Sequence, residues 1–203
     1  MRVLKCADTG VLVEVADLAQ VIALGAALKA DPLPGVTDVV PAARTVLLRL
    51  DPGADPFAIA AAVIEIPLAV EVGQSAGETI TIPVHYDGED LDDIAELTGL
   101  SPREVVRAHT EATWTVAFCG FAPGFGYMVG DDPRLKVPRR GEARTRVPKG
   151  SVALAGEFTG VYPRVSPGGW QLLGRTDAVT WDLERDPPGI LRPGVRVRFE
   201  EVG

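Results

Sequence analysis

Seven of the chain's twenty Lys and Arg residues lie between residues 134 and 149, in the tract RLKVPRRGEARTRVPK. Prolines within and beside this tract stiffen the backbone, which lowers the entropic cost of holding a guanidinium in place. Arginine binds carboxylate and phosphate groups through paired hydrogen bonds. The tract therefore indicates either an anion site or partner interface, with Arg139 and Arg146 as candidate ligands, or a solvent-exposed basic loop.

Two further stretches, GFAPGFGYM at 120–128 and SPGGWQLLGRT at 166–176, combine glycines with aromatic residues. Glycine lets a backbone approach a ligand closely, and aromatic rings supply large flat surfaces. The first stretch lacks the spacing of a dinucleotide loop, and Pro133 stands where the following helix would have to run. We interpret it as a pocket wall. The second is either a similar wall or a tight turn with Trp170 in the core.

The candidates for proton transfer and nucleophilic attack are few. His85 and His109 are the only histidines, and no HExxH motif occurs, so no metal site is predicted. His109 follows Val105 by four residues on a predicted helix, which favours a structural role. The ordinary pKa of histidine would nevertheless suit proton transfer. Cys119 lies in a strand-like run and would need His109 beside it to act as a nucleophile, and the serines lack a GxSxG motif.

The helices predicted at 90–98 and 102–112 resemble a DNA-binding helix-turn-helix. Ser101, Pro102 and Glu104 form a capping box with proline at the first helical position. The first helix is strongly acidic, however, and the second carries as many glutamates as arginines near its ends. A surface that binds phosphates should be basic, so DNA binding is not expected.

The elements that must position these residues fall into two domains. In residues 1–76, Asp17 can cap one helix, and Asp55 with Pro56 can open another that Pro67 ends. Strand-like runs occur at 11–15, 35–40, 44–50 and 68–72. The resulting βαββαβ order predicts a ferredoxin-like α+β domain. In residues 77–203, short runs such as SVALAG, WQLLG and VRVRFE between Gly/Pro turns favour a compact β-barrel or sandwich.

The composition and net charge exclude several classes of protein. The 203 residues carry a formal net charge of −8, which argues against nucleic-acid binding and acidic membranes. No apolar run reaches the length of a membrane span, and MRVLKCADTG lacks the apolar core of a signal peptide. We expect a cytoplasmic protein without disulfides.

Three long stretches, in chain order, resemble one family: HTEATWTVAFCGFAPGFGYM, VPRRGEARTRVPKGSVALAGEFTGVYP and SPGGWQLLGRT. The chain is identified as a member of the family of the 5-oxoprolinase B-subunit (PxpB), KipI and allophanate hydrolase subunit 1. This family is also similar to part of the carboxyltransferase domain of urea carboxylase. The resemblance is close between residues 81 and 199. Ala143 replaces a proline of the family's pattern and Lys149 a small residue, which bears on the shape of the basic loop.

The resemblance implies a cyclophilin-like barrel for residues 77–203. It also implies that this chain is one subunit of an enzyme that hydrolyses 5-oxo-L-proline to L-glutamate. ATP, with magnesium, would be bound here or shared with a partner. The implied partners are similar to PxpC or KipA and to PxpA. Two alternatives stay open: a KipI-like inhibitor of a sensor histidine kinase, or a component of an allophanate hydrolase or urea carboxylase system.

The resemblance also nominates site residues. We hypothesise that His109 moves a proton and that Arg146 stabilises developing charge. Arg139 would hold the substrate carboxylate or a transferred phosphate, while aromatic rings wall the pocket. The substrate-binding candidates are Phe121, Pro123, Gly124, Tyr127, Arg139, Pro148, Ser151, Pro167, Gly168, Gly169 and Trp170.

Overall fold

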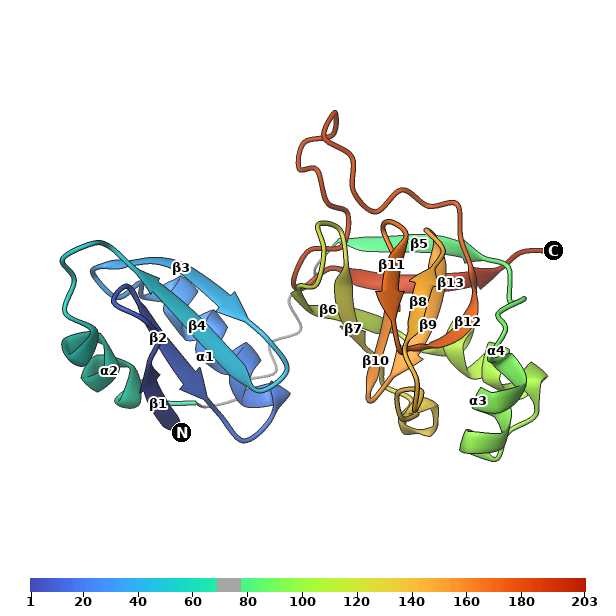
Figure 1. Cartoon of the computed structure of the whole chain (residues 1–203), viewed down its shortest axis with the longest axis horizontal. Helices are drawn as coiled ribbons and strands as arrows, with labels where there is room; N and C mark the ends of the chain where they lie inside the picture. Colours follow the sequence, from blue (N-terminus) through green and yellow to red (C-terminus); the bar gives the residue numbers. More distant parts are fainter. Residues whose placement is uncertain (69–77) are drawn as a thin grey trace. The chain divides into compact units, whose positions relative to one another are not determined.

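The computed structural model describes residues 1–68 and 78–203. The chain forms two compact units, Met1–Gln74 and Ser75–Gly203 (Figure 1). No helix among the described residues is long and apolar enough to cross a bilayer.

The first unit is an antiparallel sheet with two helices. Its sheet has the order β1-β2-β4-β3. The buried faces of β2 and β4 pack with both helices in one apolar core. The elements are β1 (Arg2–Lys5), β2 (Gly10–Glu14), α1 (Leu18–Ala30), β3 (Val36–Pro41), β4 (Thr45–Leu50) and α2 (Pro56–Ile64).

Both predicted helix starts in this unit are confirmed. The Asp17 side chain accepts a hydrogen bond from the backbone N–H of Gln20 at 2.9 Å. Asp55 accepts one from Phe57 at 2.9 Å, with Pro56 in the first turn of α2. These side chains satisfy backbone donors that the first helical turn leaves unpaired.

One strand of the first unit was not predicted. β1 is mostly exposed at the edge of the sheet, so its sequence lacks the apolar alternation of a half-buried strand. β2 pairs with β1 on one side and with β4 on the other. In a ferredoxin-like order, the strand predicted at 68–72 would take the place of β1. Residues 69–72 lie outside the described residues, so that strand stays a prediction.

The second unit is built on a seven-stranded sheet of order β12-β9-β10-β7-β6-β13-β5, which curls into a nearly closed barrel (Figure 1). β13 and β5 pair in parallel and the other neighbours are antiparallel. The prediction of a mainly-β barrel is therefore confirmed. The strands are β5 (Thr79–Val84), β6 (Trp114–Cys119), β7 (Gly126–Val129), β9 (Ser151–Ala155), β10 (Phe158–Val161), β12 (Gln171–Arg175) and β13 (Arg196–Glu201).

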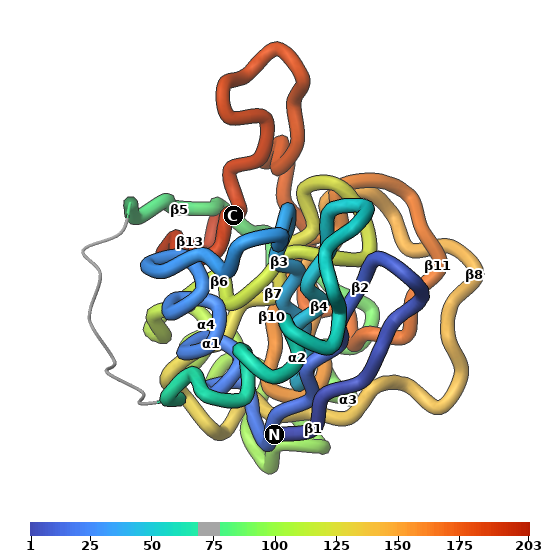
Figure 2. The backbone as a smooth tube through the Cα atoms, turned by 90° about the vertical axis from the view of Figure 1, so that its left-hand side faces the viewer, coloured from blue at the N-terminus to red at the C-terminus, as the bar shows by residue number. Residues whose placement is uncertain are grey.

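Shorter elements complete the second unit. A separate ribbon pairs β8 (Arg144–Val147) with β11 (Ser166–Gly168). The two helices are α3 (Leu91–Thr98) and α4 (Pro102–Glu111), and η1 (Pro133–Leu135) is a single 3-10 turn. The segment between β12 and β13 projects away from the sheet (Figures 1 and 2).

The two predicted helices of this unit are confirmed. Ser101 and Glu104 form the capping box, and Gly99 ends α3 with a φ of 71°. Because a side chain at that φ is strained, glycine suits this position. One face of the sheet and both helices enclose the larger apolar core, which contains Trp114 and Phe199. A second apolar cluster lies on the other sheet face, around Phe125 and Trp170.

Candidate functional site

The structure brings parts of the three family-like stretches together on one face of the second unit. The ribbon of β8 and β11 places Val147 opposite Ser166 and Arg144 opposite Gly168, so it joins the basic tract to SPGG. The Trp170 ring lies 5.3 Å from that of Phe125, which joins SPGG to the loop of residues 120–125.

That loop connects β6 and β7 and is tightly closed. The Ala122 N–H donates to the Gly120 carbonyl at 2.7 Å, so Phe121 occupies the centre of a three-residue turn. Phe121 has a φ of 67°, a left-handed conformation that is strained for an aromatic residue, yet its side chain is 56% exposed. Strain that holds an apolar ring in solvent points to a functional role.

Gly124 anchors the same loop to the projecting segment. Its φ is 82°, and an added Cβ would lie 2.6 Å from Cβ of Trp181 and 3.1 Å from Oγ1 of Thr180. Glycine is therefore required here for both conformation and space. The neighbouring Pro123 is exposed. Both predicted residues thus shape the loop, Gly124 from within and Pro123 from its surface.

Seven aromatic rings form what we call the aromatic face. The Phe125 ring contacts those of Phe121, Tyr127, Tyr162 and Trp170 edge-on at 5.0–5.4 Å between centroids. Such geometry suits the opposite charges of ring edge and ring face. The aromatic face consists of Phe118, Phe121, Phe125, Tyr127, Phe158, Tyr162 and Trp170.

Arg139 gives the aromatic face its charge. It is exposed and close enough to Tyr127 and Tyr162 to act on both phenols. Burial raises the pKa of Tyr127, and the Arg139 guanidinium partly opposes that rise. Burial likewise raises the pKa of Tyr162, while the Arg139 guanidinium and a hydrogen bond from the Trp170 backbone lower it. Tyr162 is only 2% exposed, so the half-buried Tyr127 and the exposed Arg139 guanidinium are the polar groups that an anion with an apolar body could contact here.

The SPGG turn packs directly on Tyr162. A Cβ on Gly168 would lie 2.3 Å from the Tyr162 hydroxyl oxygen, so no larger residue fits. The Gly169 carbonyl accepts a hydrogen bond from the Arg140 N–H at 2.8 Å. Trp170 is only 4% exposed. Trp170 is therefore a buried residue that packs under the aromatic face, in agreement with the alternative of a tight turn with a core tryptophan. Pro167, in the same turn, is exposed.

The basic tract separates into structural and exposed arginines. Arg140 and Arg144 both donate to Asp90, whose side chain is 2% exposed; Arg144 Nη2 lies 2.7 Å from Oδ1. Asp90 Oδ2 also accepts from the Leu172 N–H at 2.6 Å. This pairing raises the pKa of the Arg144 guanidinium. Arg139 and Arg146 are exposed and remain available to a ligand.

The other candidates of the basic tract have backbone roles. Pro148 is exposed, and its carbonyl accepts from the Ser151 N–H at 3.4 Å. Ser151 is 5% exposed at the start of β9, so it helps to end the turn rather than facing solvent. The two residues thus fix the link between β8 and β9.

The hypothesis that His109 moves a proton is corrected by the structure. His109 is fully buried on the opposite sheet face, and burial lowers its pKa to about 3. Its Nδ1 lies 2.8 Å from the Tyr86 hydroxyl and its Nε2 2.9 Å from Oγ1 of Thr159. Thr159 donates to the Ala153 carbonyl, so its oxygen accepts from Nε2–H and Nδ1 accepts from Tyr86. His109 is thus a neutral core residue whose hydrogen bonds are satisfied.

ATP with magnesium fits this face only in part. Arg139, Arg146 and Lys149 are exposed cations that could contact phosphate oxygens. The glycine stretch at 124–130 runs into β7 and then the 3-10 turn η1, so no helix N-terminus follows it. Within the described ranges, no three His, Cys, Asp or Glu side chains gather where they could hold a metal ion.

Several site residues were missed by sequence reasoning. Phe125 precedes Tyr127 by two residues and Phe158 precedes Tyr162 by four, spacings that put each pair on one side of an extended chain. Gly160 lies between the latter two, and its missing Cβ makes room for the Phe125 ring. This alternation could have revealed the aromatic face. Nothing local marks Asp90 as the partner of the arginines.

The fold and this face define a two-unit protein whose mainly-β barrel carries arginine beside clustered aromatic rings. Residues 1–191 match the carboxyltransferase domain, subdomain C and D, and the chain belongs to this family.

Curated relatives agree with this assignment. The 5-oxoprolinase B-subunit of Bacillus subtilis is 43% identical over 126 residues, which are 61% of this chain and 52% of the relative. That of Escherichia coli O157:H7 is 48% identical over 123 residues, 59% of this chain and 56% of the relative. Urea amidolyase of Saccharomyces cerevisiae is 29% identical over 154 residues, 69% of this chain and 8% of the relative. The match thus spans about half the length of the two 5-oxoprolinase relatives.

Solved structures resemble the chain as well. A conserved uncharacterized protein from Pyrococcus horikoshii is 34% identical with a TM-score of 0.59, and the match covers 99% of this chain and 97% of that one. Kluyveromyces lactis urea carboxylase is 20% identical with a TM-score of 0.80, covering 99% of this chain and 22% of that one. The latter likeness shows the fold alone.

Proposed function

We propose that this chain is a subunit of an ATP-dependent 5-oxoprolinase, which hydrolyses 5-oxo-L-proline to L-glutamate. The observation that carries the proposal is its identity of 41–48% to three relatives named as the B-subunit of 5-oxoprolinase. Its partners are sister subunits similar to PxpC or KipA and to PxpA. We also propose that residues 1–76 form a ferredoxin-like domain and that residues 77–203 form a cyclophilin-like domain. The proposed location is the cytoplasm, where ATP is present.

The aromatic face supports a role in substrate binding. 5-Oxoproline has a small ring with apolar edges and one carboxylate. Arg139 can pair with the carboxylate while Phe121 and Tyr127 contact the ring. Arg146 and Lys149, two exposed cations of the same tract, would contact phosphate during activation of the amide oxygen.

The face lacks a proton-transfer group of suitable pKa, because His109 is buried on the other side of the sheet and the pKa of Tyr127 is raised. We therefore assign the general base, together with most of the ATP and magnesium site, to a sister subunit. The strained, exposed Phe121 supports this assignment, because an apolar ring held in solvent suits contact with a partner.

The related urea amidolyase supports one second candidate, a component of an allophanate hydrolase or urea carboxylase system. The lower identity of that relative ranks this function below the first. A KipI-like inhibitor of a histidine kinase is a third candidate that the same family allows.

The test is release of glutamate from 5-oxoproline and ATP by this protein alone and after reconstitution with its sister subunits. We expect activity only in the mixture, and a large loss with Arg139→Gln. A mixture that assembles, as judged by size-exclusion chromatography, but releases no glutamate would overturn the proposal. Assays of urea-dependent ATP hydrolysis and of kinase inhibition would then decide between the other two candidates.

A further inference from the structure

The projecting segment between β12 and β13 contains a hairpin, residues 177–190 (Figures 1 and 2). Its arms pair through backbone hydrogen bonds, one of them from the Asp182 N–H to the Pro188 carbonyl at 2.9 Å. Oδ1 of Asp182 accepts from the Glu184 N–H at 3.0 Å and so closes the turn at the tip. A partner therefore does not have to order the hairpin when it binds.

The hairpin exposes three large apolar side chains. Val179, Trp181 and Leu183 occupy alternate positions and are 41%, 39% and 82% exposed. Leu183 stands in the turn itself, a position that usually carries glycine or a polar residue. Apolar side chains that gather in this way on a surface mark an interaction site.

The hairpin adjoins the aromatic face. Gly124, whose missing Cβ makes room for Trp181, directly precedes Phe125 of the aromatic face. Phe121 lies in the same loop, and its strained backbone holds the ring in solvent. The hairpin and the aromatic face are therefore neighbours on one surface of the second unit, joined by the loop of residues 120–125.

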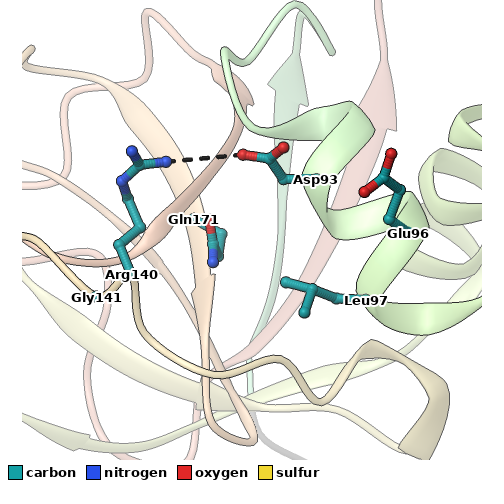
Figure 3. Close-up of a pocket in the computed structure, with 6 residues that line it drawn as sticks. All are labelled: Asp93, Glu96, Leu97, Arg140, Gly141 and Gln171. Atoms are coloured by element: carbon teal, nitrogen blue, oxygen red, sulfur yellow. Dashed lines mark ion pairs between the residues drawn. The ribbon is translucent and has the colours of Figure 1, made fainter.

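The hairpin and the aromatic face carry opposite charges. Two exposed arginines flank Tyr162 of the aromatic face: Arg139 acts on its phenol, and Arg164 follows it by two residues. None of these charges has an ion-pair partner in the described part of the chain, whereas the neighbouring Arg140 lies 3.8 Å from Oδ2 of Asp93 (Figure 3). The same holds for the three exposed acids of the hairpin, Asp177, Glu184 and Asp186.

Two complementary patches side by side fit a second copy of the same chain. A two-fold axis through the loop of residues 120–125 places the hairpin of each copy on the aromatic face of the other. Acids then meet arginines, and Leu183 meets exposed rings, at both ends of the contact. A single copy cannot make these contacts, because its own hairpin projects away from the sheet (Figure 1).

We propose that the free chain forms a two-fold symmetric dimer through this surface. The hairpin of one copy lies on Phe121 and the half-buried Tyr127 of the other, with its acids beside Arg139 and Arg164. Because the dimer covers Phe121 and Arg139, it is the form of the chain before a sister subunit binds. The dimer itself does not depend on the proposed oxoprolinase function.

The first experiment is sedimentation velocity of the full chain over a range of concentrations, at low and at high salt. We expect an equilibrium between monomer and dimer whose Kd rises as salt is added, because salt screens ion pairs between exposed groups. A chain that stays monomeric at every concentration, even at low salt, would overturn the proposal.

Two double variants test the arrangement. The hairpin variant carries Asp177→Lys and Glu184→Lys, and the face variant carries Arg139→Glu and Arg164→Glu. Each alone should dimerise about a hundredfold more weakly, since like charges then meet at both ends. Mixed together, the two variants should form a heterodimer as tight as the wild-type dimer, because opposite charges meet again at each end. A mixture that stays monomeric would contradict the arrangement.

Matched controls separate this contact from a change in net charge. Asp92→Lys with Glu96→Lys, on α3, shifts the net charge as much as the hairpin variant does. Arg103→Glu with Arg107→Glu, on α4, does the same for the face variant. Both should leave the Kd within about twofold of the wild type, since distant exposed charges are screened. Equal weakening in the controls would show general repulsion and overturn the proposal.

The apolar contact has its own test. Leu183→Gln should weaken the dimer at least about tenfold, because it removes an apolar side chain that each copy buries. Leu97→Gln is the control, since Leu97 is also an exposed leucine but lines a cavity beside α3 (Figure 3). A dimer as tight with Leu183→Gln as with Leu97→Gln would contradict the proposal.

A sister subunit is the other candidate occupant of this surface. The test is a pull-down of the sister subunit with the wild type and the hairpin variant, which depends on the proposed function as the sedimentation experiments do not. If the wild type is monomeric alone and only the hairpin variant fails to bind the sister subunit, that subunit is the occupant and the dimer is wrong. A homodimer that persists in the active reconstituted complex would also overturn the proposal.

Discussion

Oδ1 of Asp90 lies 2.7 Å from Nη2 of Arg144, fifty-four residues later in the chain. The same oxygen accepts from Arg140, and Oδ2 accepts from the Leu172 N–H. A single buried carboxylate therefore joins the start of α3, the basic tract and β12. The exposed arginines of the candidate site extend from a tract that this carboxylate fixes in place.

We expect Asp90→Asn to destabilise the second unit by about 3 kcal/mol, because it leaves two partly buried guanidiniums without a counter-charge. Urea unfolding followed by tryptophan fluorescence measures the change. Asp92→Asn, an exposed change in the same helical turn, should stay within about 0.5 kcal/mol of the wild type. If the two variants were equally stable, the structural role of Asp90 would be wrong.

His109 should make stability depend on pH. Burial lowers its pKa from 6.5 to about 3, so the unfolded state binds the proton more readily than the folded state. Its contribution is complete above pH 6.5 and is lost as pH falls from there toward 3. At about 1.4 kcal/mol per pKa unit, the loss is of the order of 4 kcal/mol over this range.

The measurement is urea unfolding at several pH values between 7 and 4 for the wild type and His109→Gln. The acidic residues contribute to both proteins, so the difference between the two curves isolates the histidine. We expect the variant to be less stable at pH 7 and to lose less stability on acidification. Parallel curves would show that His109 is accessible to protons in the folded state.

The sequence allowed prediction of features that depend on neighbouring residues, but not of contacts between residues far apart in the chain. Asp17 and the Ser101–Glu104 pair act within one helical turn, so their caps could be predicted from neighbouring residues. The pairing of Asp90 with two of seven basic residues depends on a turn of the chain fifty residues away. The spacing of His109 from Val105 indicated a buried helix face, but the depth of burial, which sets the pKa, is a tertiary property.

Two glycines should respond to alanine in opposite directions. Gly25 lies inside α1 with open space around its missing Cβ, so Gly25→Ala should stabilise the first unit by about 0.5–1 kcal/mol. At Gly160 a Cβ would lie 2.8 Å from Cζ of Phe125, so Gly160→Ala should destabilise the second unit by about 1–3 kcal/mol. Urea unfolding curves of the two variants provide the measurement. A stabilised Gly160→Ala variant would contradict the packing of the aromatic face.

Arg139 and Arg103 offer a comparison within the reconstituted enzyme. Both are exposed, but Arg103 lies on α4 and Arg139 beside Tyr127. Arg139→Gln should lower kcat/KM for 5-oxoproline by about a hundredfold, the effect of removing one charge contact from a reacting complex. Arg103→Gln should leave kcat/KM unchanged. Equal effects of the two variants would remove Arg139 from the site, while unfolding curves check that both proteins remain folded.

The strain at Phe121 predicts an unusual order of stabilities. Glycine adopts a φ of 67° freely and alanine does not, so Phe121→Gly should be more stable than Phe121→Ala by about 1 kcal/mol. Both variants lose the ring contacts with Phe125 and Tyr162. Phe57 is the control, because it is 75% exposed within α2, where alanine should be the more stable replacement. The measurement is urea unfolding of the four variants. If the alanine variant were more stable than the glycine variant at both positions, Phe121 would be unstrained. If the ring serves a partner, both Phe121 variants should bind the sister subunit more weakly in a pull-down assay, although their stabilities differ.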